Sequence, residues 1–181
     1  DVLVLPRHGL GHALAPHEID HASNMAALKQ LGVTHVIGLS AVGSLKADLP
    51  PGAVVVLDDF IGQREMPSLR GYPTELSGCL HAQFTNPFCP ALRNILINTL
   101  GPSGNCRPSG TYVQTAGPRF ETPAEVRLYR DWGGDVVGMT CVSEAVAGRY
   151  AGLHYAGIAC VTNLGSGIEG AEPAHEEIVS A

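Results

Sequence analysis

The segment from Thr115 to Thr122 and the pair Thr162-Asn163 contain three complementary kinds of side chain. Phe120 offers a flat aromatic face, Glu121 a carboxylate acceptor, and Asn163 an amide that both donates and accepts hydrogen bonds. A purine with an oxo group at C6 presents an N1–H donor, which Glu121 can accept, and an O6 acceptor for the Asn163 amide. Adenine presents the reverse pattern, so these residues favour a 6-oxopurine. On its own, the Phe120-Glu121 pair could equally be a core aromatic and a helix-entry charge.

A second set of residues is suited to bind an oxyanion. Arg7-His8-Gly9 follows the first apolar run directly, and an Arg guanidinium can hold an oxyanion by two hydrogen bonds while Gly permits close approach. The small residues 40–44 follow a second apolar run and predict a turn that offers hydroxyl and N–H groups. The alternative reading is a surface ion pair for Arg7 and a solvated His8.

Short apolar or β-branched runs predict buried strands, and the stretches between them predict helices. The expected strands are residues 2–5, 33–39, 54–57, 111–114 and 154–161. The expected helices are residues 19–31, 90–100, 123–132 and 143–151. Because strands and helices alternate, the expected fold class is α/β. Residues 1–181 are expected to form a single domain, since 45% of them are hydrophobic and no linker interrupts them.

The start of the helix expected at residues 123–132 is marked by local signals. Thr122 is a suitable N-cap, Pro123 fits the first turn, and Glu125 lies near the positive end of the helix dipole. This start leaves Phe120 and Glu121 in the preceding loop, where side chains can face a ligand.

The chain resembles the trimeric purine nucleoside phosphorylases, particularly the branch that contains methylthioadenosine and methylthioinosine phosphorylases. The resemblance extends over nearly the whole chain. Its most specific segments are residues 7–12 (RHGLGH), 38–45 (GLSAVGSL), 115–122 (TAGPRFET) and 138–144 (GMTCVSE), with Asn163. It implies a single-domain, three-layer α/β/α fold with a central mixed sheet, nucleoside phosphorylase-like.

The resemblance also implies site residues. The expected phosphate-binding residues are Arg7, His8, Ser40, Ala41 and Thr140. The expected purine- and ribose-binding residues are Phe120, Glu121, Met139, Asn163 and His81. Asn163, Glu121 and His8 are expected to be catalytic. Inorganic phosphate is a co-substrate in this family, and no metal or organic cofactor is expected.

The implied reaction is phosphorolysis of purine nucleosides to the free purine and (deoxy)ribose 1-phosphate or its 5-methylthio analogue. Methylthioadenosine-specific relatives have Asp where this chain has Asn163, and no acidic residue where it has Glu121. The chain therefore resembles the inosine and guanosine pattern, whereas residues 7–12 and His81 resemble the methylthio branch. The expected substrates are methylthioinosine, inosine and guanosine. Methylthioadenosine phosphorylase is the alternative.

Subunit contacts follow from the same resemblance. A homotrimer is expected, in which His81 reaches across a subunit boundary toward the 5′ end of the neighbour's sugar. His81 belongs to the irregular segment 62–83, which is rich in Pro and Gly and typical of lids or contact surfaces. Met66, Leu69 and Tyr72 are expected to be buried against the neighbour.

Two further alternatives concern activity. Compared with the family pattern, the chain is expected to lack the N-terminal strand with its phosphate-contacting turn and the C-terminal helix, so an inactive fragment is one alternative. A metal-binding module built on His8, His12, His17 and His21 is the other. Only His17 and His21 could share a helix face, and no Cys lies nearby, so no metal site is expected.

The composition of the chain limits the classes of partner that are expected. The net charge is −6 and the 11 basic residues are scattered, so no nucleic-acid partner is expected. No apolar run approaches the roughly 20 residues of a membrane span, so no membrane partner is expected. The five cysteines form no C-x-x-C pair, which favours a reducing compartment and a cytoplasmic location.

Overall fold

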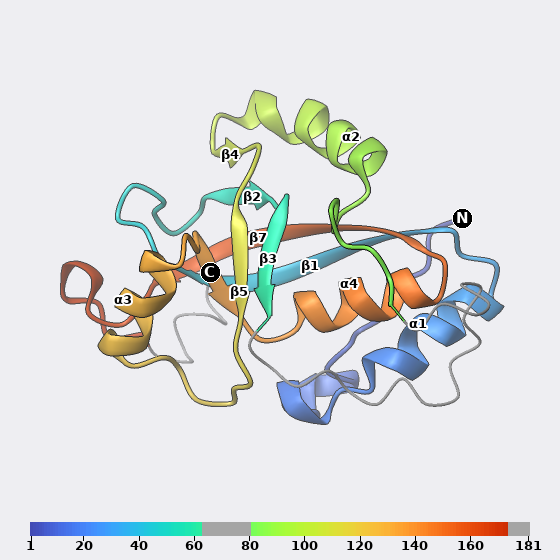
Figure 1. Cartoon of the computed structure of the whole chain (residues 1–181), viewed down its shortest axis with the longest axis horizontal. Coiled ribbons are helices and arrows are strands. Elements are labelled where there is room, and N and C mark those ends of the chain that lie inside the picture. Colours follow the sequence, from blue (N-terminus) through green and yellow to red (C-terminus); the bar gives the residue numbers. More distant parts are fainter. Residues whose placement is uncertain (63–80, 174–181) are drawn as a thin grey trace.

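The computed structural model describes residues 1–62 and 81–173, while residues 63–80 and 174–181 lie outside the described part (Figure 1). The described strands form one mixed, seven-stranded sheet in the order β3-β5-β6-β1-β7-β2-β4. The strands are β1 (His35–Ser44), β2 (Val54–Val56), β3 (Asp59–Gly62), β4 (Cys106–Arg107), β5 (Thr111–Gln114), β6 (Val136–Gly138) and β7 (His154–Leu164).

The two long strands β1 and β7 form the middle of the sheet. They run parallel, from the pair His35 and His154 to the pair Ser44 and Leu164, with a register shift between Val42 and Gly43. Strand β6 joins β1 in antiparallel pairing at Gly43 and Ser44, and β2 joins β7 in antiparallel pairing. The other neighbouring strands are parallel. The carboxyl ends of β1 and β7 therefore lie together beside β6.

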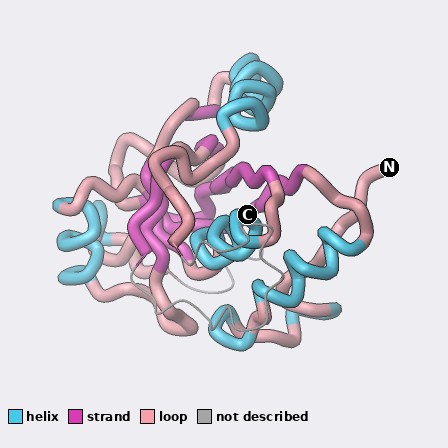
Figure 2. The backbone as a smooth tube through the Cα atoms, turned by 45° about the vertical axis from the view of Figure 1, so that its right-hand side comes forward, coloured by secondary structure: helices cyan, strands magenta, loops and turns pink. Residues whose placement is uncertain are grey.

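Helices cover both faces of this sheet (Figure 2). The α-helices are α1 (His21–Gln30), α2 (Pro90–Leu100), α3 (Pro123–Asp131) and α4 (Cys141–Tyr150). Short 3-10 helices span Leu10–His12, Pro16–Glu18, Gly101–Ser103 and Ile168–Gly170. Helices α1 and α4 pack against Tyr155 of β7, whereas α2 packs against the next residue, Ala156. Because side chains alternate along a strand, these helices lie on opposite faces. The three-layer α/β/α fold is confirmed.

The largest difference from the expected strands is at residues 2–5, which form no strand. Val2 is 90% exposed and Val4 88% exposed. The run has the composition of a strand, but a strand needs a neighbour to accept and donate its backbone hydrogen bonds, and no described strand pairs with it. The prediction of a strand here was wrong.

The small residues 40–44 also differ from expectation. They continue β1 and pair with β7, whereas the sequence predicted a turn. The turn prediction was wrong because small, polar residues are compatible with a strand whose partner and register are set by tertiary pairing. The helix expected to begin at residue 143 begins two positions earlier, at Cys141.

The start of α3 agrees with the prediction. The Thr122 side chain accepts a hydrogen bond from Glu125 N at 3.2 Å, and the Glu125 carboxylate accepts one from Thr122 N at 2.8 Å. Arg119 donates to both carboxylate oxygens of Glu125 at 2.8 Å, and this hydrogen bonding lowers the Glu125 pKa to about 2. The loop that carries Phe120 and Glu121 is therefore anchored at its end.

Two further expectations concern the subunit contact and membrane spans. Met66, Leu69 and Tyr72 lie outside the described part of the chain. Among the residues that are described, no helix has the length and apolar character needed to cross a membrane.

Candidate active site

A cavity of about 560 Å³ opens where β1, β6 and β7 end beside the loops around residues 8–18 and 118–121. All five residues expected to bind phosphate line it: Arg7, His8, Ser40, Ala41 and Thr140. Four of the expected purine- and ribose-binding residues line it too: Phe120, Glu121, Met139 and Asn163. His81 is exposed and is not among the lining residues. The structure thus brings these nine residues together, while their individual roles remain predictions.

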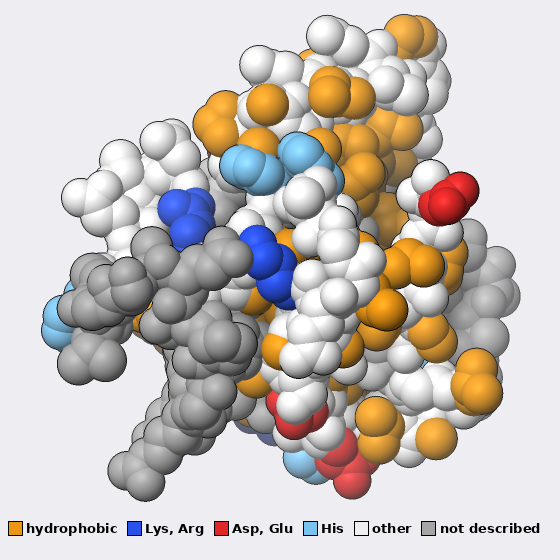
Figure 3. All heavy atoms as spheres, turned by 90° about the vertical axis from the view of Figure 1, so that its right-hand side faces the viewer, with side chains coloured by type: hydrophobic (Ala, Val, Ile, Leu, Met, Phe, Trp, Pro, Cys, Tyr) orange, Lys and Arg blue, Asp and Glu red, His pale blue; other side chains and the backbone are white. Residues whose placement is uncertain are grey.

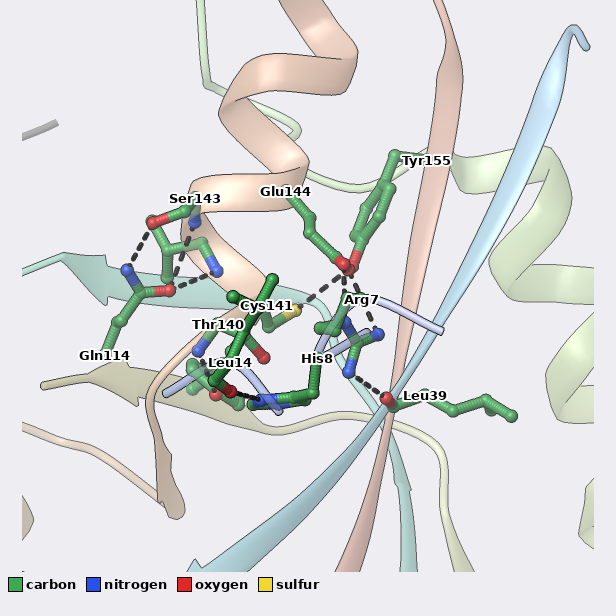
Figure 4. Close-up of polar contacts among 12 residues, drawn as sticks. Arg7, His8, Leu14, Leu39, Gln114, Thr140, Cys141, Ser143, Glu144 and Tyr155 are labelled. Carbon is green, nitrogen blue, oxygen red and sulfur yellow. Dashed lines mark hydrogen bonds and ion pairs between the residues drawn. The ribbon is translucent and has the colours of Figure 1, made fainter. Parts of the chain in front are cut away.

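Arg7 lies in a largely buried ion pair rather than in a surface one. Its Nε donates to Glu144 Oε1 at 2.6 Å and its Nη2 to Glu144 Oε2 at 3.2 Å, while Nη1 donates to the Leu39 carbonyl at 2.7 Å (Figure 4). Burial, the largest single influence, disfavours the cation, but the attraction and hydrogen bonds of Glu144 together with Tyr155 and Cys141 outweigh it and raise the pKa of Arg7. These contacts use three of the five guanidinium N–H groups, and one on each Nη remains available to an anion.

His8 has an orientation fixed by its own loop. Its Nδ1 lies 2.9 Å from the Leu14 carbonyl oxygen, and its ring stacks on His12 with the centroids 4.1 Å apart. A carbonyl oxygen only accepts, so Nδ1 carries a proton, and Nε2 of the neutral ring is an acceptor that can take a hydrogen bond from the P–OH group of a hydrogen phosphate. The Ser40 hydroxyl, also at the cavity, is buried with no hydrogen-bond partner among the described residues. Such a group is typical of a ligand site.

The beginning of α4 is held in place by Gln114 of β5. Gln114 Oε1 accepts hydrogen bonds from Val142 N at 2.8 Å and Ser143 N at 3.1 Å, and Nε2 donates to Ser143 Oγ at 2.7 Å (Figure 4). These contacts use backbone N–H groups at the helix start that could otherwise donate to an anion. Thr140, which directly precedes the helix, therefore lines the cavity from a backbone that is held in place.

The Asn163 amide keeps one donor and one acceptor for a ligand. Its Nδ2 donates to the Leu164 carbonyl at 3.0 Å, and its Oδ1 accepts from Thr162 Oγ1 at 3.0 Å. An amide nitrogen has two N–H groups and an amide oxygen two lone pairs, so one of each remains. This is the pattern needed for a purine O6 and a protonated N7.

Glu121 is held from two sides. Thr115 Oγ1 donates to Glu121 Oε1 at 2.7 Å, which leaves Oε2 available to a ligand. Ser166 Oγ donates to the Glu121 carbonyl at 2.6 Å and so ties the loop after β7 to the loop before α3. Burial raises the pKa of Glu121, although the Thr115 hydrogen bond opposes the shift.

Met139 and Phe120 complete the wall of the nucleoside half. Met139 packs over Gly117, whose φ of +62° suits glycine, and a Cβ at Gly117 would lie 2.5 Å from the Met139 sulfur. Gly117 is therefore required both for the backbone turn and for the close approach of Met139.

Several supporting residues were not assigned by the sequence. These are Thr115, Gln114, Glu144, Tyr155 and Ser166. Glu144 lies within the recognised segment 138–144, but its partner Arg7 is 137 positions away, so no spacing rule links them. The role of Thr115 could have been predicted more easily, since Thr115 begins the segment that contains Glu121.

A second hollow of about 650 Å³ lies beside the beginning of β1 and is lined mainly by apolar residues, including Leu3, Leu31 and Ile37. Figure 3 shows hydrophobic side chains spread over the side of the molecule on which the N-terminus lies. This hollow is larger, but it has no side-chain amide among its lining residues and only one side-chain hydroxyl, that of Thr34. The smaller cavity is therefore the better candidate site.

Among the described residues, no three or more His, Cys, Asp or Glu side chains are grouped for a metal ion.

Polar side chains gathered at strand ends in a three-layer α/β fold define the class of an enzyme that acts on a small molecule. The chain belongs to the phosphorylase superfamily, whose family model matches residues 1–181. This match confirms the resemblance to the nucleoside phosphorylases that the motifs indicated.

Individual relatives are named for nucleoside phosphorolysis. The probable 6-oxopurine nucleoside phosphorylase of Dictyoglomus turgidum is 46% identical over 180 residues, which cover 99% of this chain and 68% of that protein. The 6-oxopurine nucleoside phosphorylase of Pyrococcus furiosus is 44% identical, with 99% of this chain and 70% of that protein covered. A mutant of the adenosine/methylthioadenosine phosphorylase of Schistosoma mansoni, solved with adenine, superposes with a TM-score of 0.89 at 34% identity, covering 98% and 69% of the two chains.

Proposed function

We propose that this protein catalyses phosphorolysis of 6-oxopurine nucleosides, giving the free purine and a (deoxy)ribose 1-phosphate or its 5-methylthio analogue. The observation that carries the proposal is one cavity that holds the Glu121 carboxylate and the Asn163 amide beside Arg7, Ser40 and Thr140. Relatives named as 6-oxopurine nucleoside phosphorylases support the same substrate class. Phosphate is the co-substrate, and no resident cofactor is proposed.

In the proposed reaction, a phosphate oxygen attacks C1′ as the bond from C1′ to the purine nitrogen breaks. The bonding electrons pass to the purine, which takes a proton from water at N7. The remaining lone pair of Asn163 Oδ1 accepts from that N7–H, and the remaining Nδ2–H donates to O6. These hydrogen bonds strengthen as negative charge develops on the base, so they stabilise the transition state more than the bound substrate.

Phosphate is proposed to bind at the Arg7 end of the cavity. The remaining N–H groups of Arg7, the Nε2 of His8 and the hydroxyls of Ser40 and Thr140 supply the contacts, beside the backbone of Ala41. A phosphate there would give the buried Ser40 hydroxyl a partner. Holding the anion in place converts a bimolecular attack into an oriented one.

The second candidate is methylthioadenosine phosphorolysis, favoured by the similarity to the Schistosoma mansoni structure with adenine. An adenine would place its N1 lone pair opposite the Glu121 carboxylate, where two acceptors would face each other. Buried acceptors without donors are costly, so Glu121 argues against this candidate. A 5′-methylthio group remains compatible with the proposal in the form of methylthioinosine.

Incubation with inosine tests the reaction type. With inorganic phosphate present, we expect hypoxanthine and ribose 1-phosphate in equal amounts, and without phosphate we expect neither. Chromatography of both products makes the measurement. Free ribose in place of ribose 1-phosphate would identify a hydrolase and contradict the proposal.

The pH dependence of activity should report on Glu121. Because burial raises its pKa, Glu121 takes up a proton at a higher pH than an exposed Glu as the solution is acidified. The protonated carboxyl no longer accepts from purine N1–H as a carboxylate does. We therefore expect kcat/KM for inosine to fall on the acid side above the usual Glu range, and Glu121→Gln to remove that limb. An unchanged acid limb in Glu121→Gln would assign it to another group.

We also propose a homotrimer in which His81 serves the neighbour's active site. The exposure of His81 outside its own chain's cavity supports this arrangement. The single sheet shared by the described strands supports treating residues 1–181 as one domain. A role in purine salvage in the cytoplasm fits the phosphate requirement and the cysteine pattern.

Replacing His81 tests the shared site. His81→Ala should raise KM for methylthioinosine several-fold while leaving the fold intact, since an exposed side chain contributes little packing. His154→Ala, at another exposed histidine, is the control and should leave KM unchanged. Light scattering measures the mass, and a monomeric active protein would contradict the shared site.

A further inference from the structure

The Arg7 guanidinium is held by a carboxylate that is itself built into the core. Glu144, on the first turn of α4, is only 3% exposed. Its Oε2 accepts a hydrogen bond from the Tyr155 hydroxyl of β7 at 2.7 Å, and both of its oxygens accept from Arg7 (Figure 4). Burial raises the pKa of Tyr155 well above its usual value, so the hydroxyl keeps its proton and donates.

The backbone of β1 makes room for this arrangement. A Cβ at Gly38 would overlap the Tyr155 hydroxyl and would come within 3.0 Å of Glu144 Oε2. One residue further along β1, the Leu39 carbonyl accepts the third Arg7 hydrogen bond at 2.7 Å. Strands β1 and β7 and helix α4 therefore all fix the position of one guanidinium.

We propose that Glu144, itself oriented by Tyr155 and by the space at Gly38, is a positioning residue for phosphate that aims the remaining N–H groups of Arg7 into the cavity. This inference rests on the proposed function. Nothing requires Glu144 to touch substrate, because it acts through Arg7.

The physical reason is the loss of freedom that a long side chain would otherwise undergo on binding. A solvated Arg samples many rotamers, and ordering it costs up to roughly 2 kcal/mol. Here the Nε and Nη2 edge is occupied by Glu144, and Nη1 is directed by Leu39, before any anion arrives. The guanidinium is therefore preorganised to bind an anion through one N–H of each Nη.

A competing interpretation gives the opposite sign. Glu144 places a negative charge near the proposed phosphate and partly neutralises Arg7, so on this interpretation its removal strengthens anion binding. Tyr155 weakens this effect, since its hydroxyl donates to the same carboxylate and shares its charge. A buried Arg that loses its carboxylate partner must also leave its site or remain uncompensated, and both outcomes disorder the phosphate contacts.

The test uses Glu144→Gln, which keeps the shape of the side chain but removes the second acceptor for Arg7. We expect KM for phosphate to rise about tenfold, with KM for inosine changed less than about twofold and kcat retained at saturating phosphate. Tyr155→Phe should raise KM for phosphate in the same direction by a smaller factor. Asp48→Asn removes the carboxylate of a remote surface pair with Arg107 and should leave KM for phosphate unchanged.

A double-mutant cycle separates positioning from general support of the fold. In an Arg7→Ala background, Glu144→Gln should change KM for phosphate less than about twofold, because Glu144 has no Arg7 left to orient. An undiminished effect in that background would overturn the proposal. So would a lower or unchanged phosphate KM in Glu144→Gln, or an equal rise in both Michaelis constants.

Calorimetry with inorganic phosphate alone gives a readout that does not require turnover. We expect the dissociation constant for phosphate to rise in Glu144→Gln and in Tyr155→Phe, in the order found for KM. If the unmodified protein binds phosphate but does not cleave inosine, the proposed function fails while this inference is still measured. If phosphate binds equally well to all three proteins, the inference fails and the proposed function stands.

Discussion

Asn163→Asp should reduce the preference for inosine over adenosine by about 100-fold, as expected when a site built to hydrogen-bond one base loses a donor to it. The Asn163 amide donates to O6 through its remaining Nδ2–H, whereas an Asp carboxylate can only accept. An acceptor at this position matches the 6-amino group of adenine. The ratio of kcat/KM for the two nucleosides is the quantity to measure.

The control for this substitution is Thr162→Val. Val leaves the amide present and removes the Thr162 hydroxyl, which lies 3.0 Å from Asn163 Oδ1 and 3.3 Å from the Val42 carbonyl oxygen. We expect a lower kcat/KM for inosine with the preference for inosine retained. If Asn163→Asp also retained the full preference, base choice would have to come from other residues.

Arg7→Ala should raise KM for phosphate by about 100-fold, since two charge-assisted hydrogen bonds and a positive charge are removed. KM for the nucleoside should change little, because the purine half of the cavity uses Glu121 and Asn163. Initial rates over a matrix of phosphate and inosine concentrations measure both constants. Equal losses in both would mean that Arg7 supports the fold rather than the phosphate site.

The stability of the Arg7→Ala variant has to be measured together with its kinetics. Arg7→Ala leaves the buried Glu144 without its cation, which is expected to cost roughly 3–5 kcal/mol of unfolding free energy. Adding Glu144→Gln should restore part of the thermal stability without restoring phosphate affinity. Arg107→Ala, which breaks an exposed pair with Asp48, is the matched control and should change neither property.

Elements with local signals were predictable from the sequence. Helix α2 begins at Pro90 and ends at Leu100 as expected, and the Thr122 cap and Glu125 define the start of α3. Proline, capping side chains and helix ends act over a few residues, so a single sequence contains their whole cause.

Elements that depend on a distant partner were not predictable in the same way. Residues 40–44 extend β1 because β7 pairs with them, whereas no described strand pairs with residues 2–5 despite their strand-like composition. The two-residue strand β4 exists through its pairing with β2. In each case the deciding hydrogen bonds join segments that are far apart in sequence.

The residues of the candidate site show the same difference between local and long-range causes. The cavity-lining residues lie in recognisable short segments, so Glu121, Asn163 and Arg7 could be proposed from the sequence. The residues that hold them, such as Thr115 for Glu121 and Glu144 for Arg7, are defined by distances in the folded chain. From the sequence alone, the Glu144 carboxylate would be expected to repel a nearby phosphate, and only the folded structure shows that it pairs with Arg7.

The choice of a 6-oxopurine base by Glu121 and Asn163 is tested most directly by one assay. Phosphate-dependent cleavage of inosine, methylthioinosine and methylthioadenosine should be compared side by side on the same preparation. The Glu121 and Asn163 pair predicts that kcat/KM for one or both of the 6-oxopurine nucleosides exceeds that for methylthioadenosine by about 100-fold or more. A preference for methylthioadenosine would contradict this account of the site.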